Sequence, residues 1–199
     1  MPMIRETVVA TVNLAGEPHL APLGLICEGD FWILAPFHPS TTLENLRLAP
    51  YAVANLTDDV RVFAGCLTGR RDWPLVPAHV VKAPRLRDAL AHLELVVVEV
   101  RDDPQRPRFV CRVAHQETHG PFRGFNRAQS AVIEGAILIS RLHMISRAEI
   151  EDELARMEIV VRKTAGPEEF EAWGWLRERA ARFFAAGEAA GQSADRPGS

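Results

Sequence analysis

The sequence predicts an α+β fold, in which a small antiparallel β-barrel or sandwich is followed by a helical domain. In the first part of the chain, short Val- and Thr-rich runs alternate with turn signals roughly every eight to twelve residues, as in all-β domains. After Gly120 the apolar residues instead recur at helical spacing. We therefore expect a β-domain over residues 1–122, a three-helix domain over 123–187 and a disordered tail over 188–199.

The β-domain is predicted to consist mainly of hairpins. Residues 7–14 are rich in Val and Thr and end at a tight-turn signal at 15–17, after which an apolar run resumes. A single strand is expected at 31–35. The predicted hairpins pair residues 7–14 with 19–27, 51–56 with 60–66, and 95–101 with 108–115.

The helix starts are marked by hydroxyl, acidic and proline residues. Glu44 follows Thr41 by three positions, as in a capping box, and Pro50 ends that first helix. The predicted helices begin at Ser40 to Thr42, at Pro84, near Phe125, at Ser146 and at Gly166.

Composition excludes several classes of protein. The net charge of −3 comes from interleaved acidic and basic residues without a basic stripe, which argues against a nucleic-acid partner. No apolar stretch approaches the ~20 residues of a membrane-spanning helix, and we expect no signal peptide, because the first residues lack a charged segment followed by an apolar run. Cys27, Cys66 and Cys111 are odd in number and widely spaced, which is typical of reduced thiols. We expect a cytoplasmic protein with no membrane partner.

The helix start at 40–42 is the first candidate binding site. The chain contains no dinucleotide fingerprint, phosphate loop or nucleophile elbow, so a phosphorylated ligand would need another device. A helix start offers unpaired N–H groups, and the hydroxyls of Ser40, Thr41 and Thr42 lie there, with Asn45 and Arg47 farther along. The same pattern also fits a helix in which one hydroxyl caps the backbone and the others are solvated.

Two other polar segments allow more than one interpretation. Residues 115–119 (HQETH) resemble a two-histidine, one-carboxylate metal set, but polar residues leaving a strand are commonly just solvated, and we expect no metal. Asn126 fits an N-cap, with Arg123 and Arg127 near a helix start, where the dipole disfavours a cation. These residues either contact a cofactor or an interface, or face solvent.

Several of these segments together resemble a known group of proteins. Residues 12–24 (VNLAGEPHLAPLG) resemble the opening hairpin of FMN-binding split-barrel proteins, the flavin-reductase-like group. Residues 31–37 followed by 39–46 (PSTTLENL) are similar to the strand and helix at which that group binds flavin phosphate. Residues 125–134 (FNRAQSAVIE) and 140–142 (SRL) resemble an uncharacterised branch with a helical C-terminal domain. That branch occurs in methanogens and in bacteria with pterin-linked one-carbon metabolism.

The resemblance implies an antiparallel split β-barrel of the FMN-binding type followed by a small three-helix domain. It also implies a homodimer with FMN at the subunit interface. The paired Arg/Lys phosphate clamp of the pyridoxamine-phosphate-oxidase branch is missing, so that substrate is not implied. The implied cofactor-binding residues are Pro22, Gly24, Leu25, Pro36 and Phe37 along the ring, Ser40, Thr41, Thr42 and Asn45 at the phosphate, and Asn126 and Arg127 across the cleft.

The function that the resemblance implies is that of an FMN-dependent oxidoreductase or reductase acting on a small molecule. In such a protein the flavin carries the electrons or hydride, so no protein acid or base needs to stand out in the sequence. One alternative is a non-catalytic flavin-binding or protein-interaction module, tied to pterin-linked one-carbon metabolism. Another is a pterin or a deazaflavin bound in the same cleft.

Overall fold

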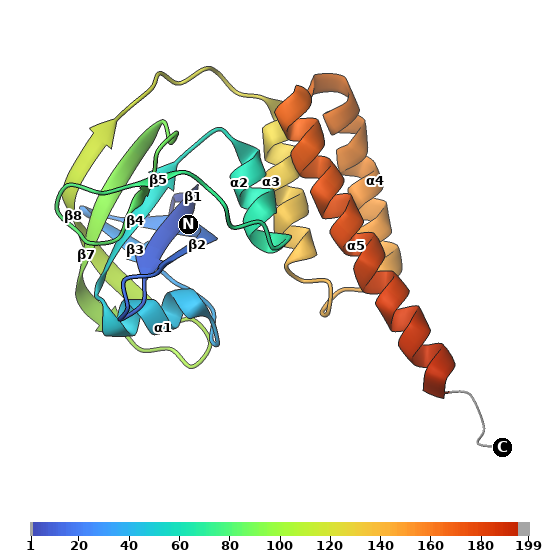
Figure 1. The fold of residues 1–199 in the computed structure, drawn as a ribbon, viewed down its shortest axis with the longest axis horizontal. Coiled ribbons are helices and arrows are strands. Elements are labelled where there is room, and N and C mark those ends of the chain that lie inside the picture. The colour runs from blue at the N-terminus through green and yellow to red at the C-terminus, as the bar shows by residue number, and fades with distance from the viewer. Residues whose placement is uncertain (1, 195–199) are drawn as a thin grey trace. The chain divides into compact units, whose positions relative to one another are not determined.

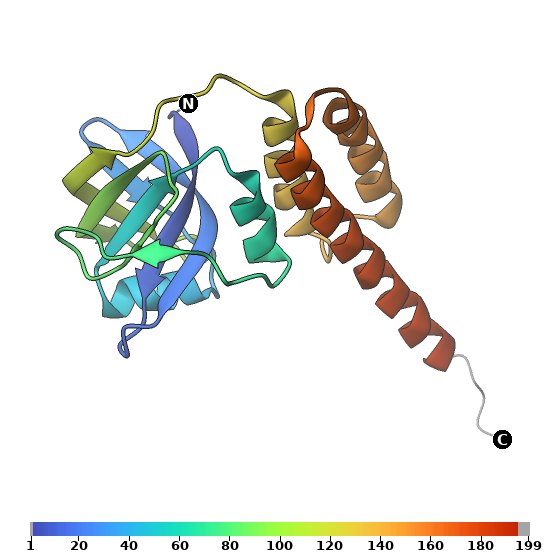
Figure 2. The ribbon, with the colours of Figure 1, turned by 45° about the horizontal axis from the view of Figure 1, so that its top comes forward.

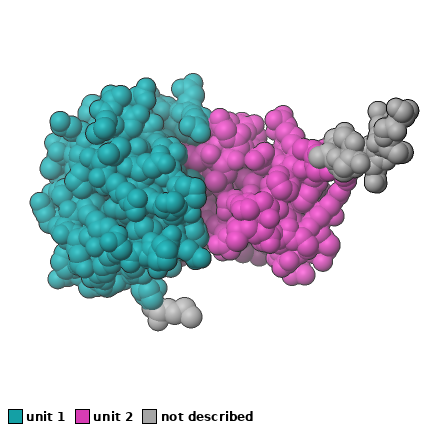
Figure 3. All heavy atoms as spheres, turned by 90° about the horizontal axis from the view of Figure 1, so that it is seen from below, with its two compact units in different colours: residues 1–58, 71–123 teal, residues 59–70, 124–199 magenta. Residues whose placement is uncertain are grey.

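The computed structural model describes the backbone of residues 2–194 and the side chains of residues 2–188. The chain divides into two compact units (Figure 3). The first combines residues up to 58 with residues 71–123, and the second combines residues 59–70 with the chain from 124 on. Among the described residues, no helix combines the length and the apolar character needed to cross a membrane.

The first unit is a closed six-stranded antiparallel barrel with the strand order β1-β2-β3-β8-β7-β4 (Figures 1 and 2). A separate two-stranded sheet pairs β5 (Leu75–Val76) with β6 (Arg85–Leu86). The predicted α+β class with an antiparallel barrel is thereby confirmed. The barrel strands are β1 (Ile4–Val12), β2 (Pro18–Glu28), β3 (Phe31–Leu34), β4 (Tyr51–Leu56), β7 (Ala91–Arg101) and β8 (Arg108–Thr118).

Alternation along the strands divides the apolar side chains between two cores. Val9 of β1 points into the barrel, where Leu25 and Phe109 also lie, whereas its neighbour Ala10 packs outside with Val53. Helix α1 (Thr41–Leu48) contributes to the barrel interior, and Figure 1 shows it lying against one end of the barrel. The buried residues that α1 adds to this core are Leu43 and Leu46.

The outer core is covered by the segment that links β5 to β6. Val81 of this segment packs beside β1 and β4. Glu94 of β7 is fully buried, and its carboxylate accepts hydrogen bonds from the backbone N–H groups of His79, Val80 and Val81 at 2.6–2.8 Å. Burial raises the pKa of Glu94, but these three bonds and His92 outweigh it and lower the pKa to about 2. The carboxylate therefore anchors the segment to the barrel.

Two predicted elements of the first 100 residues are wrong. Residues 60–66 form helix α2 (Val60–Leu67) rather than a strand, because a short apolar run fits either period and Asp59 caps it by accepting from the N–H of Arg61 at 3.0 Å. The helix predicted from Pro84 is replaced by β6, whose Leu86 donates its N–H to the Asn55 side chain at 2.8 Å. Tertiary pairing overrides the local helix signal there.

The second unit is a bundle of α2 with α3 (Arg127–Ile139), α4 (Arg147–Thr164) and α5 (Pro167–Ala194). Its core includes Val132, Ile150, Leu176 and Trp173. Ser146 caps α4, as predicted, by accepting from the N–H of Glu149. The tail expected to be disordered from 188 differs from the structure, in which the backbone of α5 continues to Ala194, and residues 195–199 lie outside the described part.

Candidate functional site

Strand β2 extends well beyond its described pairing with β3. Strand β2 pairs with β1 continuously from Pro18 to Ile26, whereas the described pairing with β3 covers only Ile26 to Glu28. Successive residues of an antiparallel strand point their N–H and C=O groups to alternate sides. Every second residue between Pro18 and Leu25 therefore presents its backbone groups on the side away from β1. Pro22, Gly24 and Leu25, the predicted ring contacts on β2, all lie on this stretch.

The three predicted β2 residues have different environments. Leu25 is fully buried in the barrel interior, so only its backbone can face a ligand. Pro22 and Gly24 are partly exposed. A Cβ atom on Gly24 would lie 2.8 Å from Cγ2 of Ile4, so a larger residue there would have to displace the exposed Ile4 side chain. Packing against Ile4 therefore favours a small residue at this position, whether or not a ligand binds.

The segment after β3 is held by an arginine that the sequence did not single out. Arg106 donates from Nε and Nη2 to the carbonyl oxygen of Ala35 at 3.1 and 3.0 Å. Its guanidinium also lies 4.3 Å from the centre of the Phe37 ring, in a cation–π contact. Phe37 is about half exposed, whereas Pro36 is buried. A cation and an exposed aromatic ring therefore stand together just before α1.

Arg106 is positioned by the tip of the β7–β8 hairpin. Asp103 accepts from the backbone N–H groups of Gln105 and Arg106 at 2.8 and 2.7 Å, which fixes the turn. The N–H of His38 donates to the carbonyl oxygen of Gln105 at 2.9 Å. The Asp103 turn signal is visible in the sequence, but the position of the hairpin tip beside residues 35–38 depends on tertiary structure.

The start of α1 keeps part of the predicted phosphate set together. Ser40 is the N-cap and accepts from the N–H of Leu43 at 3.3 Å, so the capping box predicted between Thr41 and Glu44 is wrong by one position. Thr41 is exposed, and Thr42 is buried. The helix start therefore offers unpaired backbone N–H groups with the Ser40 and Thr41 side chains, a favourable setting for an anion.

The remaining residues predicted near this helix lie elsewhere. Asn45 is buried, and its side-chain amide donates to Thr11 Oγ1 at 3.0 Å, so it joins α1 to β1 rather than facing the helix start. Arg47 lies in the last turn of α1. Asn126 and Arg127 belong to the second unit, where Asn126 caps α3 by accepting from the N–H of Ala128 at 2.8 Å.

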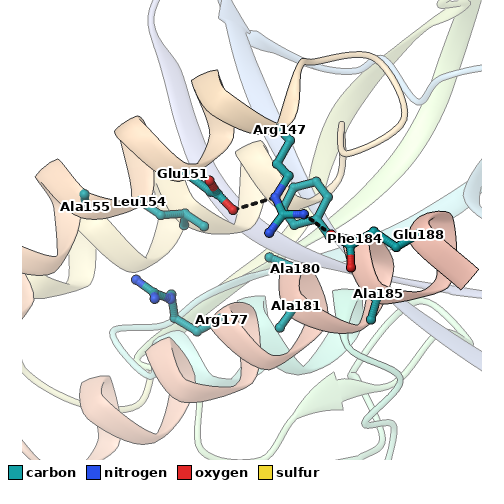
Figure 4. Close-up of a pocket in the computed structure, with 10 residues that line it drawn as sticks. All are labelled: Arg147, Glu151, Leu154, Ala155, Arg177, Ala180, Ala181, Phe184, Ala185 and Glu188. Atoms are coloured by element: carbon teal, nitrogen blue, oxygen red, sulfur yellow. Dashed lines mark hydrogen bonds and ion pairs between the residues drawn. The ribbon is translucent and has the colours of Figure 1, made fainter.

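The second unit carries a hollow of ≈480 Å³ between α4 and α5, shown in Figure 4. Its apolar lining comes from Leu154, several alanines and Phe184. Arg147 reaches between Glu151 and Glu188 and pairs with both (Figure 4), while Arg177 pairs with Glu158. The charged side chains that line the hollow are therefore held in ion pairs, and the pair of Arg177 is formed with a residue outside the lining.

Comparisons with known proteins agree with this architecture. The family model of the DUF447 N-terminal domain matches residues 5–120, and the second model, described as protein of unknown function (DUF447), matches residues 126–178. An FMN-bound protein of this family from Methanosarcina mazei is similar over 90% of this chain and 96% of that chain, with a TM-score of 0.79 and 20% sequence identity.

Two further solved structures share the barrel at lower similarity. The similarity to the 2-nitrobenzoate 2-nitroreductase of Pseudomonas fluorescens covers 60% of this chain and 66% of the nitroreductase chain, with a TM-score of 0.50 and 20% identity. An FMN-binding protein of Thermus thermophilus with bound p-hydroxybenzaldehyde covers 60% and 73%, with a TM-score of 0.51 and 18% identity. The two family models together span most of the sequence, and the chain therefore belongs to the DUF447 family.

Proposed function

We propose that this chain binds FMN in the gap beside residues 18–25 of β2, which lie outside the described pairing with β3, and that the bound flavin serves an oxidoreductase or reductase reaction on a small molecule. The observation that carries the proposal is the convergence of an unpaired β2 backbone edge, the Phe37–Arg106 pair and an open helix start at Ser40 within one unit. The membership of an FMN-bound structure in the same family supports it.

The residues of the gap fit the chemical parts of FMN. The phosphate would be held by the N–H groups at the start of α1 with the Ser40 and Thr41 hydroxyls, and Arg106 would add positive charge. The polar edge of the isoalloxazine ring would be held by backbone groups of β2 around Gly24, with Phe37 as an apolar surface. When bound, the flavin would supply electron or hydride transfer, and this chain would bind and orient it.

Two copies of the chain would complete the site. Phe37 beside the gap and Ile4 beside Gly24 are both about half exposed, which leaves an apolar rim that a second copy would cover. In the resulting homodimer the flavin would lie at the subunit interface. Sedimentation velocity with and without FMN tests this point, and a monomer in both conditions would remove the dimer from the proposal while leaving the flavin site intact.

The absorbance spectrum of the freshly purified protein tests the proposal. Bound FMN gives the near-ultraviolet and blue bands of oxidised flavin, and reduction by NADH or NADPH bleaches the blue band. A flavin that binds but is not reduced, with no turnover on quinones or ferric chelates, would favour the alternative of a non-catalytic flavin-binding or interaction module. Stronger stabilisation by a pterin or a deazaflavin than by FMN would assign the gap to that heterocycle.

A further inference from the structure

Four of the seven histidines lie close together in the first unit, at a place that the flavin proposal does not use. Strands β7 and β8 pair His92 with Glu117 and Glu94 with His115. Because these residues alternate along both strands, their four side chains share one face of the sheet. The segment between β5 and β6 adds His79, and the residue after β8 adds His119. We call these six side chains the histidine cluster.

The donor atoms of the cluster form three overlapping sets, each compact enough to hold one ion. Nε2 of His79 lies 3.0 Å from Oε2 of Glu117, and the rings of His79 and His115 have centroids 4.7 Å apart. Nδ1 of His92 lies 2.9 Å from Nε2 of His119. Three sets have ligand atoms that all lie within 4.8 Å of one another, namely His79 with His115 and Glu117, His92 with Glu117 and His119, and His92 with Glu94 and His115.

One ring nitrogen in the cluster has no protein partner. Nε2 of His115 is buried and makes no hydrogen bond to any described residue. A buried polar atom left in this state costs about 1–3 kcal/mol, so such atoms usually mark an unseen water, ion or functional role. Histidine ring nitrogens are the commonest metal ligands in proteins.

Two members of the cluster, Glu94 and His92, are already engaged in hydrogen bonds. The Glu94 carboxylate is occupied by three backbone N–H groups, and its Oε1 also lies 3.3 Å from Nε2 of His92. Because this carboxylate accepts, Nε2 of His92 donates to it, and the tautomer and ring orientation of His92 are fixed. A carboxylate behind a histidine is the arrangement that commonly supports a metal site from outside the ligand shell.

We propose that the histidine cluster binds one divalent transition-metal ion of the zinc class, with His79, His115 and Glu117 as its protein ligands. This set includes His115, whose Nε2 has no protein partner among the described residues. It leaves out His92, whose side chain is hydrogen-bonded to Glu94. Imidazole and carboxylate ligands suit Zn²⁺, Co²⁺ and Ni²⁺, whereas Mg²⁺ and Ca²⁺ prefer all-oxygen shells. The His79 and Glu117 side chains are about half exposed, so an ion can enter from solvent and keep an open position for water.

A metal ion at this site would also join two segments that are far apart in the sequence, the β5–β6 segment and β8. From the sequence we expect no metal in residues 115–119, because polar residues that leave a strand are commonly solvated. The structure adds His79, which lies 36 positions before His115 and two before the buried Val81. An ion bound at this set would tie the β5–β6 segment to β8, so binding should stabilise the barrel.

Metal titration of the tag-free, metal-free protein tests the site. Zn²⁺ is added in competition with a chromophoric chelator, and Co²⁺ is added separately to record its ligand-field absorption. We expect one Zn²⁺ per chain with a dissociation constant in the micromolar range or tighter, and a rise in melting temperature. His79→Ala, His115→Ala and Glu117→Gln should each weaken zinc binding at least about tenfold, and His143→Ala, at an exposed position in the second unit, should leave it unchanged.

The exposed ligand His79 keeps the test independent of folding. Far-UV circular dichroism should show that His79→Ala retains the fold while losing zinc affinity and the zinc-dependent rise in melting temperature. The proposal is overturned if the folded wild-type protein binds no Zn²⁺ at submillimolar concentration, or if all three ligand variants bind as the wild type does. Loss of binding in His119→Ala with retention in His79→Ala would also overturn this ligand assignment.

Discussion

The side-chain amide of Asn45 donates a hydrogen bond to the hydroxyl oxygen of Thr11 at 3.0 Å, and both side chains are buried. This bond connects the helix whose start forms the candidate phosphate site to the strand that pairs with β2. The orientation of the helix start therefore depends on a polar contact inside the barrel, in addition to the apolar side chains Leu43 and Leu46.

Substitution of Asn45 tests this connection. Asn45→Ala should lower the free energy of unfolding by about 1–3 kcal/mol, because Thr11 is left buried without this partner. Chemical denaturation measures the loss, and a double-mutant cycle with Thr11→Val should give a coupling energy of about 1 kcal/mol. Additive losses in the cycle would show that the bond does not hold α1.

Arg106 should contribute to flavin binding directly, and its loss should weaken FMN binding without disturbing the rest of the fold. Arg106→Ala removes the contact with Phe37 and both hydrogen bonds to Ala35. We expect FMN to bind about tenfold more weakly, which corresponds to about 1.4 kcal/mol. Arg108→Ala is the matched control, since Arg108 is on the same hairpin but pairs with the exposed Glu28. Equal effects of the two substitutions on FMN titrations would contradict a specific role for Arg106.

Replacement of glycine by alanine should change the stability of the helical unit in opposite directions at two positions. A Cβ on Gly135 of α3 would lie 2.8 Å from Cζ3 of Trp173 and 3.3 Å from Cδ1 of Leu176, so Gly135→Ala should destabilise the unit by about 1–3 kcal/mol. Gly174 of α5 is exposed, and a methyl group added there would meet no atom within 4 Å, so Gly174→Ala should stabilise the unit by up to about 1 kcal/mol. Thermal denaturation of the two variants checks both signs.

The pH dependence of the helical unit should depend partly on Glu158. The hydrogen bond from the Trp173 indole N–H at 2.7 Å, with Arg162 and Arg177 nearby, lowers the pKa of Glu158 below its ordinary 4.5 against the opposing effect of burial. A carboxyl whose pKa is lower in the folded state stabilises the protein above the unfolded-state pKa and loses this effect as pH falls. Glu158→Gln should therefore destabilise the protein at pH 7, and the difference from wild type should shrink below about pH 4.5.

Urea denaturation of both proteins at neutral and acidic pH measures that difference. A constant difference between wild type and Glu158→Gln across the range would show that the carboxylate charge is not what stabilises the Trp173 contact. The conservative change keeps an oxygen acceptor for the indole N–H, so the pH-dependent part reports the charge.

Much of the barrel was predictable because its strands carry local signals. The hairpin around residues 13–17 formed where the turn chemistry indicated, with Asn13 accepting from the N–H groups of Ala15 and Glu17. The structure of residues 60–66 was not predictable, since a seven-residue, mostly apolar segment has no decisive period. The Asp59 cap there outweighs the β-branched residues. The local sequence pattern does not distinguish a strand from a helix when the segment is this short.

The candidate sites were only partly predictable for a different reason. Ser40 and Thr41 adjoin one another in sequence, so their shared helix start could be recognised. Arg106 and His79 are brought to the candidate sites by strand register and loop placement, which a single sequence does not specify. The burial of Asn45 was likewise invisible, because helical periodicity shows which residues share a face but not which partner that face meets.

The most direct test of the flavin proposal is a fluorescence titration of the cofactor-free protein with FMN and with riboflavin. Riboflavin lacks the phosphate, so the helix start at Ser40 should bind FMN at least about tenfold more tightly, and Thr41→Ala should weaken FMN while leaving riboflavin unchanged. Saturable quenching with that preference is the expected result. Absence of saturable quenching, or equal affinities for the two flavins, would contradict the proposed site.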